Sequence, residues 1–225
     1  MPCIKAGSTV GGGHHDVGGG RRDAAPVTFA SVPDPDERPT FYYDLGSPYS
    51  WLAAERIHQV LPETAVWQPI LLGGIWQQTG GGSWGRTDKR DEGMREVEKR
   101  ASEYGLLPVK WPDDWPTNTL KAMRAAIFAQ QTGRAVAFSL AAFRQAFAAG
   151  KDLQEIDNVL IAAAACELHP NAVLKAIELQ STKDRLKEAT QEAYDRGVRG
   201  VPSVAIDDQV FWGDDRLEEA AAAMA

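Results

Sequence analysis

A serine, Ser47, stands between a short aromatic run and an expected helix in the stretch FYYDLGSPYSWLAAERI, residues 41–57, and a second serine, Ser50, follows three residues later. The apolar spacing after the turn predicts an amphipathic helix that begins directly behind Ser47. The N-terminus of a helix carries free N–H groups and about half a positive charge, which favours an anion such as a thiolate. If a cofactor brings a thiol, the Ser47 hydroxyl can donate a hydrogen bond to its sulfur and lower the thiol pKa below about 8.5. Ser47 is therefore our candidate catalytic residue.

The motif Ser47-Pro48-Tyr49-Ser50 also excludes one reaction. A hydroxyl cannot accept or pass electrons, so disulfide exchange at this turn is chemically impossible. A purely structural interpretation competes with the catalytic one, because a serine before a proline is an ordinary N-cap followed by a proline at N1, worth about 1 kcal/mol. The sequence leaves both interpretations open.

A second candidate is the loop Gly200-Val201-Pro202, which follows an expected helix and precedes an expected strand. A proline there suits either a cis peptide bond or the first residue of an edge strand. A cis bond would leave the Val201 backbone N–H and C=O free to pair with an extended, peptide-like ligand. A trans proline that only starts the strand is the alternative.

The third candidate is the segment FWGDDRLEE, which starts at Phe211. Asp215 and Arg216, at the N-terminus of the last expected helix, could hold the amino and carboxylate groups of a γ-glutamyl moiety. Alternatively, Asp215 and Glu218 form a variant of the capping box and have no role beyond it.

The elements that must position these residues follow from apolar spacing and from the glycines and prolines. We expect strands at 40–44, around 65–71, at 203–206 and at 209–212, helices at 48–60 and 215–224, and helices through most of 88–196. The glycine-rich stretch from Gly73 to Gly82 is expected to be a loop. This order of elements, βαβ, a block of helices and ββα, is most economically assembled as an α/β thioredoxin-like fold with an all-helical insertion.

The expected division of the chain has three parts. Residues 40–72 and 197–225 form the thioredoxin-like domain, and residues 73–196 form the helical insertion. Residues 1–39 contain glycine tracts and a proline-rich run with no apolar periodicity, so we expect a disordered N-terminal extension without a catalytic role.

Composition narrows the classes of partner. The formal charge of −7 and the sequence pI of about 5.2 argue against nucleic acid. No apolar run approaches the roughly 20 residues that span a bilayer, so no membrane is expected. Only two cysteines occur, which rules out a disulfide framework and favours a reducing, cytoplasmic location. The four histidines lack ligand-like spacing, so no metal site is expected.

The segments FYYDLGSPYSWLA, GVRGVPS and FWGDDRLEE together resemble those of 2-hydroxychromene-2-carboxylate isomerases and kappa-class glutathione transferases, relatives of the DsbA oxidoreductases. The resemblance covers about residues 40–225. It implies that Ser47 activates glutathione and that the cis-proline loop pairs with the glutathione backbone. The glutathione-binding residues that it implies are Val201 and Pro202 of that loop, together with Trp212, Asp214, Asp215 and Arg216. A homodimer is also implied.

The implied reaction is an isomerisation of an aromatic catabolite, in which a thiolate adds to an unsaturated carbon, permits rotation about the former double bond and is expelled. A kappa-like transferase, which releases the conjugate, is the alternative enzyme. The segment from Thr79 to Trp84 departs from the family's pattern and lacks an asparagine that would help to hold glutathione. Another low-molecular-weight thiol, or a non-catalytic thiol- or peptide-binding protein, is therefore also considered.

Substrate contacts are expected from two further places. The stretch from Pro116 to Thr119 is similar to a family segment near the substrate pocket, which makes Asn118 a candidate contact. Trp76, together with Trp111 and Trp115, could form the wall of an aromatic substrate site, or these tryptophans could be core or lid residues.

Overall fold

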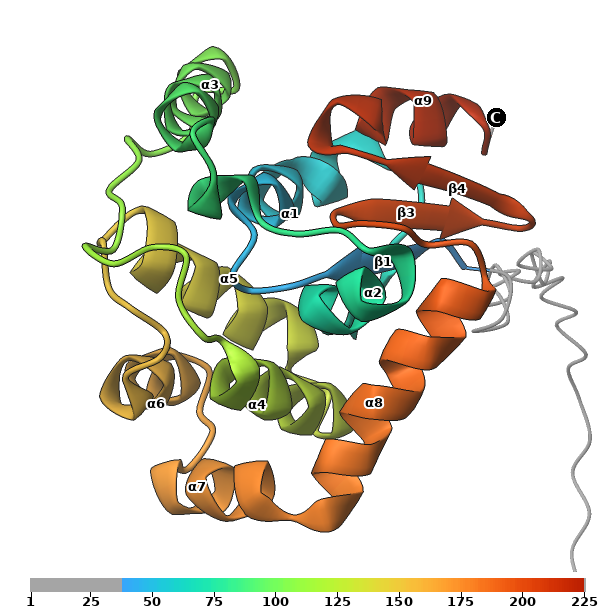
Figure 1. Cartoon of the computed structure of the whole chain (residues 1–225). Coiled ribbons are helices and arrows are strands. Elements are labelled where there is room, and N and C mark those ends of the chain that lie inside the picture. The colour runs from blue at the N-terminus through green and yellow to red at the C-terminus, as the bar shows by residue number, and fades with distance from the viewer. Residues whose placement is uncertain (1–37, 225) are drawn as a thin grey trace, which may run out of the picture. The chain divides into compact units, whose positions relative to one another are not determined.

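A four-stranded mixed sheet organises the residues that the structure describes. This computed structural model describes residues 38–224, so the expected extension over residues 1–39 lies outside the description except for its last two residues. The strand order is β2-β1-β3-β4 (Figure 1). The strands are β1 (Thr40–Tyr43), β2 (Val66–Pro69), β3 (Ser203–Ile206) and β4 (Gln209–Trp212).

The connection from β1 to β2 is the βαβ unit that the sequence predicts. Helix α1 (Pro48–Val60) joins the two strands, which pair in parallel with Phe41 opposite Trp67. Strand β3 pairs with the other side of β1 in the antiparallel direction, and β4 forms the predicted hairpin with β3. The first and last parts of the chain therefore meet in the middle of the sheet.

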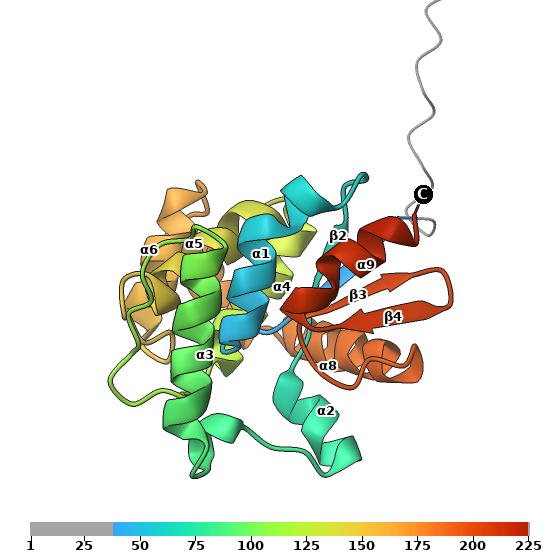
Figure 2. The same cartoon turned by 90° about the horizontal axis from the view of Figure 1, so that it is seen from above.

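Alternating side chains of β1 pack on two different layers. Phe41 and Tyr43 point into the larger core with residues of α1 and of the helices between β2 and β3. Tyr42 points to the opposite face and packs with Ile75 and Ala189. Figure 2 shows α1 and α9 on one side of the strands and α8 on the other. This is the period-two pattern of a strand buried on both faces.

Helices make up most of the chain between β2 and β3. They are α2 (Leu72–Thr79), α3 (Arg90–Glu103), α4 (Leu120–Gln131), α5 (Ala135–Phe147), α6 (Ile156–Ala165), α7 (Pro170–Glu178) and α8 (Gln180–Asp195), with a short 3₁₀ turn η1 (Trp84–Arg86) before α3. The fold is the predicted thioredoxin-like one, and its mainly helical middle is confirmed. The division at residues 72/73 and 196/197 stays a prediction. Within residues 38–224, none of the helices combines the length and the hydropathy that spanning a bilayer requires.

The prediction of a loop from Gly73 to Gly82 is wrong for residues 73–79, because they belong to helix α2. A Cβ on Gly74 would lie 2.9 Å from Thr190 Cγ2 of α8, so glycine permits a close approach of the two helices. Packing against α8 thus outweighs the low helix propensity of Gly73 and Gly74. The helix ends at Gly80, whose φ of 73° is left-handed.

The end of the chain differs from the prediction in detail. The expected helix from residue 215 begins as a 3₁₀ turn, η2 (Asp214–Arg216), and continues as α9 (Leu217–Ala222). The peptide bond between Val201 and Pro202 is cis, so the alternative of a trans proline is wrong.

Candidate functional site

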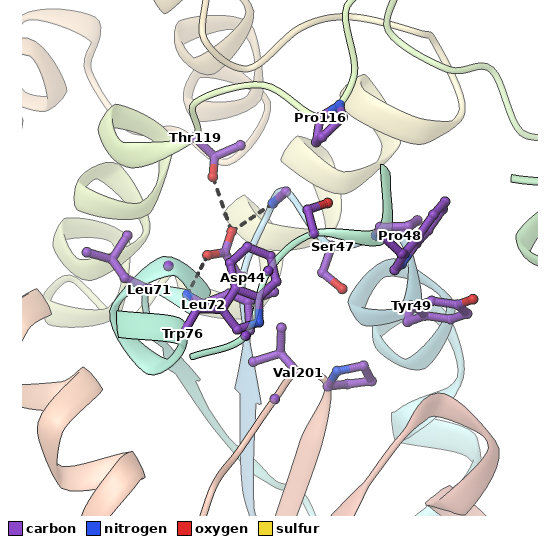
Figure 3. A pocket seen from close by; sticks show the side chains of 18 of the residues that line it. Asp44, Ser47, Pro48, Tyr49, Leu71, Leu72, Trp76, Pro116, Thr119 and Val201 are labelled. Carbon is purple, nitrogen blue, oxygen red and sulfur yellow. Dashed lines mark hydrogen bonds between the residues drawn. The ribbon is translucent and has the colours of Figure 1, made fainter. Parts of the chain in front are cut away.

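A cavity of about 900 Å³ opens where β1 ends and α1 begins. Its wall comes from six segments: the β1–α1 turn, α2 with the loop that follows it, α3 through Arg100, the loop before α4, the cis-proline loop, and the turn after β4. Side chains on its wall are drawn in Figure 3. The volume is in the range of small-molecule sites.

Ser47 is both a helix cap and a cavity residue. Its Oγ accepts a hydrogen bond of 3.2 Å from the Ser50 backbone N–H, which confirms the capping interpretation. The cap uses Oγ as an acceptor, so the hydroxyl hydrogen can still be donated to a ligand. Figure 3 shows Ser47 between Pro116 on one side and Val201 on the other, and all three line the cavity. Capping and thiol activation are therefore compatible.

The Val201 backbone offers a pairing edge to a ligand. Among residues 38–224, neither its N–H nor its carbonyl has a hydrogen-bond partner, although Val201 lines the cavity and is only 6% exposed. The next carbonyl, of Pro202, accepts a hydrogen bond of 3.0 Å from the Gly213 N–H. That bond brings the turn after β4 beside the cis-proline loop.

The two aspartates of that turn have different surroundings. Asp214 is buried, with Oδ1 accepting from Arg100 Nη1 at 3.0 Å and Oδ2 from the Tyr104 hydroxyl at 3.1 Å. Burial raises the pKa of the Asp214 carboxyl, and Arg100 partly opposes this rise. Asp215 lines the cavity with its side chain 59% exposed, and Arg100 Nη1 lies 3.6 Å from its Oδ2. Asp215 is thus the more exposed of the two aspartates, and it shares Arg100 with Asp214.

Arg216 is not brought to the cavity with the other candidates. Its guanidinium pairs with Glu219 and lies 5.4 Å from the centre of the Phe211 ring. The alternative of a capping box is also wrong, because no side chain caps η2 or α9 and Glu218 pairs with Arg56.

Trp212 lies at the rim of the cavity and is 56% exposed. Its indole covers Gly200, where an added Cβ would lie 2.4 Å from Trp212 Cε2. The absence of a side chain at Gly200 is therefore what lets the tryptophan lie against the cis-proline loop.

Asp44 organises the opposite wall, although no sequence pattern predicted a role for it. Its carboxylate accepts three hydrogen bonds, from Gly46 N–H (2.9 Å), Leu72 N–H (2.9 Å) and the Thr119 hydroxyl (3.1 Å) (Figure 3). It thereby joins the β1–α1 turn to the starts of α2 and α4. Burial raises its pKa, although all three hydrogen bonds act in the opposite direction. An Asp two residues before a Gly signals a turn, but the partners at 72 and 119 lie too far along the chain to be read from sequence.

Aromatic side chains line part of the cavity, as expected in outline. Trp76 and Trp115 line it, whereas Trp111 lies behind Trp115, with ring centres 4.8 Å apart. Trp84, not foreseen, lines it as well and lies 4.8 Å from the Trp115 ring. Trp115 is only 5% exposed, so it is a core residue and a wall residue at once.

Asn118, the expected substrate contact, also lines the cavity. Its Oδ1 accepts a hydrogen bond of 3.0 Å from the Leu120 N–H at the start of α4. The side-chain amide N–H₂ has no hydrogen-bond partner among the described residues and can reach a ligand.

Three arginines in the cavity wall were not anticipated: Arg86, Arg100 and Arg199. Arg86 and Arg100 come from segments without a motif, whereas Arg199 lies within the GVRGVPS segment, where only the cis-proline loop was singled out. Within residues 38–224 no group of three or more His, Cys, Asp or Glu side chains could hold a metal ion. The charged groups of the site are thus guanidinium and carboxylate groups.

The fold and the serine-capped helix define a thioredoxin-like protein without thiols at the first strand-to-helix turn. The family model described as DSBA-like thioredoxin domain matches residues 40–225, so the chain belongs to this family.

Two relatives align with this chain over most of their own length. The chain is 26% identical over 186 residues to the 2-hydroxychromene-2-carboxylate isomerase of Sphingobium xenophagum, covering 79% of this chain and 93% of the relative. It is also 26% identical over 194 residues to human glutathione S-transferase kappa 1, covering 79% and 86%. A solved structure of a 2-hydroxychromene-2-carboxylate isomerase superposes with a TM-score of 0.75 at 23% identity, covering 83% of this chain and 93% of that one, which shows the shared fold.

Proposed function

We propose that the protein is a glutathione-dependent isomerase of the 2-hydroxychromene-2-carboxylate isomerase type. The observation that carries the proposal is that Ser47, at the N-terminus of α1, lines the same cavity as the Val201 backbone, whose N–H and carbonyl have no hydrogen-bond partner within residues 38–224. A peptide thiol needs two features in its site. One is a hydroxyl donor at a positive helix end, which stabilises the thiolate, and the other is a free backbone edge, which pairs with the peptide.

The residues present fit such a thiol. The Val201 N–H and carbonyl pair with its peptide backbone, and the exposed Asp215 carboxylate binds its amino group. Trp212 covers the rim beside the loop. Arg216, which lies outside the cavity, has no part in this assignment.

When bound, glutathione supplies the thiol that adds reversibly to a double bond of the substrate. The chain's contribution is to favour the anionic form of that thiol. Ser47 donates its hydroxyl hydrogen to the sulfur, while the N–H groups and dipole of α1 lower the thiol pKa. The buried position of Ser47, 6% exposed, strengthens this hydrogen bond because little water competes for it.

The substrate is proposed to be an aromatic catabolite. Trp76, Trp84 and Trp115 offer aromatic surface, and Asn118 adds a polar contact at the same wall. Support for the reaction type comes from the isomerase of Sphingobium xenophagum, 93% of whose length aligns with this chain.

A kappa-like glutathione transferase is the second candidate, favoured by the alignment with 86% of human glutathione S-transferase kappa 1. The same residues would activate the thiol, and the two functions differ only in whether the product keeps it.

An assay with 2-hydroxychromene-2-carboxylate, with and without glutathione, tests the proposal. We expect equilibration of the substrate that depends on glutathione and leaves the free-thiol concentration unchanged. Stoichiometric loss of free thiol would indicate a transferase. Thiol binding without turnover of this substrate or of electrophilic transferase substrates would indicate a non-catalytic binding protein. The predicted homodimer can be tested on the same sample by light scattering.

A further inference from the structure

Two guanidinium groups in the cavity wall have no acidic partner among residues 38–224. Arg100 pairs with Glu96, Asp214 and Asp215, whereas Arg86 and Arg199 form no ion pair with any described carboxylate. Charged groups that line a ligand cavity without a partner are free to bind a ligand of opposite charge.

The Arg199 side chain is held in place by neutral groups. Its Nη1 donates hydrogen bonds to the carbonyls of Tyr194 (2.7 Å) and Val198 (3.1 Å), and its guanidinium lies 4.2 Å from the centre of the Tyr194 ring. These contacts order the side chain without neutralising its charge. A pre-positioned cation loses little entropy when it binds an anion.

The order of groups along this wall gives it a direction. Asp215 comes two residues after Gly213, and the Gly213 N–H donates a hydrogen bond to the carbonyl of Pro202. Asp215 therefore lies near the Pro202 end of the cis-proline loop. Arg199 lies at the other end of the loop, and the free Val201 backbone lies between the two. The wall thus presents a carboxylate at one end, a pairing edge in the middle and a guanidinium at the other end.

We propose that Arg199 binds the C-terminal carboxylate of the peptide thiol. This inference rests on the proposed function. A peptide thiol has an amino group at one end and a carboxylate at the other, so only one direction satisfies both charges, with the amino group at Asp215 and the carboxylate at Arg199. That direction is antiparallel to residues 199–202. The site therefore selects a small peptide thiol with a free C-terminal carboxylate over a neutral thiol.

Arg86 provides the comparison within the same cavity. Its Nη2 lies 3.4 Å from the carbonyl of Pro116. Figure 3 shows Pro116 and Val201 on opposite sides of Ser47, so Arg86 belongs to the wall across from the pairing edge. A ligand paired with Val201 is expected to meet Arg199 and not Arg86.

Isothermal titration with glutathione and with its glycine monoethyl ester tests the inference without an activity measurement. The ester removes the terminal charge and keeps the thiol and the amino end. We expect the wild-type protein to bind glutathione about 10- to 100-fold more tightly than the ester, as for a charge-assisted hydrogen bond. Arg199→Gln should bind glutathione about 10- to 100-fold more weakly than the wild type does, and it should bind glutathione and the ester with equal affinity. Arg199→Lys should retain part of the preference for glutathione.

Arg196→Gln is the matched control, because Arg196 is an exposed arginine near the same loop that contacts the Asp207 carbonyl and does not line the cavity. It should bind as the wild type does. Equal affinity of the wild type for glutathione and ester, or a preference lost in Arg86→Gln but kept in Arg199→Gln, would overturn the inference and leave the proposed function standing. If the wild-type protein bound neither glutathione nor its ester, both the inference about Arg199 and the proposed function would be wrong.

Discussion

The guanidinium of Arg100 lies 3.0 Å from the buried carboxylate of Asp214, although 114 residues separate them in sequence. Tyr104, the C-cap residue of α3, donates its hydroxyl hydrogen to the other carboxylate oxygen. Helix α3 is thereby fixed to the turn after β4, next to the exposed Asp215. An element with no cavity motif of its own thus helps to shape the end of the site that we assign to the ligand's amino group.

Replacing Arg100 with Gln should destabilise the protein and weaken thiol binding. The change leaves Asp214 buried without its counter-charge, which costs about 3 kcal/mol in the free energy of unfolding. Urea denaturation measures this loss. Lys99→Gln is the control, because Lys99 and Glu103 are 3.8 Å apart with side chains 67% and 56% exposed, and such pairs contribute under about 1 kcal/mol. Equal losses in both variants would mean that the Arg100–Asp214 pair is not the cause.

Ser47→Ala should lower the rate of thiol-dependent turnover by roughly tenfold to a thousandfold, because a hydrogen bond to the thiolate is lost. It should also cost about 1 kcal/mol of stability through the lost N-cap. Turnover measured at saturating thiol and thermal unfolding separate the two effects.

Ser50→Ala is the matched control for that experiment. The Ser50 hydroxyl is buried and has no hydrogen-bond partner among the described residues, so its removal should leave turnover unchanged and stability equal or slightly higher. If Ser47→Ala stays within twofold of the wild-type rate, Ser47 is a cap and nothing more.

Asp44→Asn should loosen the wall that α2 and α4 form. In the variant, an N–H₂ group replaces one of the two carboxylate oxygens, and each of these oxygens now accepts a hydrogen bond from a backbone N–H. Because an N–H₂ group cannot accept such a bond, at least one is lost, at a cost of about 1–3 kcal/mol. We expect a lower free energy of unfolding and a weaker glutathione affinity in a titration. The exposed Asp113, changed to Asn, should show neither effect.

The cost of Asp44→Asn should depend on pH. Burial raises the pKa of Asp44 above its ordinary value of 3.8, so the folded protein binds this proton more tightly than the unfolded chain does. The stability that this carboxyl contributes is then fully present below its unfolded pKa and is lost as pH rises through the folded pKa. Since Asn does not titrate, the variant's deficit should be larger at about pH 4 than at about pH 7. A deficit that grows with pH would show that the three hydrogen bonds outweigh burial.

Gly200→Ala should displace Trp212 from the cis-proline loop. The new Cβ would lie 2.4 Å from Trp212 Cε2, and the exposed indole can move outward more easily than the backbone can. Glutathione affinity should fall while thermal stability changes little. In the Trp212→Ala background the same substitution should have no further effect on affinity, as expected for two residues that act as a unit. Additive losses in the double variant would contradict this coupling.

Much of the fold could be predicted because its signals are local. Apolar spacing, a serine before a proline and the glycines at helix ends act within a few residues, and they located α1, the β3–β4 hairpin and the helical middle. The prediction was wrong for α2, where the propensity of Gly73 and Gly74 is overridden by packing against Thr190 of α8. A glycine in sequence does not tell whether it marks a turn or a close approach of two helices.

The candidate site likewise has some features that could be predicted from the sequence and others that could not. The residue types alone show that a hydroxyl, and no thiol, stands before the first helix and that a proline loop precedes the third strand. The folded chain was needed to show that Asp44 joins three segments, that Arg100 pairs with Asp214, that Arg216 lies outside the cavity, and that Arg199 lines it. The physical reason is that these properties depend on burial and on partners far apart in the chain, and an isolated charged residue carries no local signal of either.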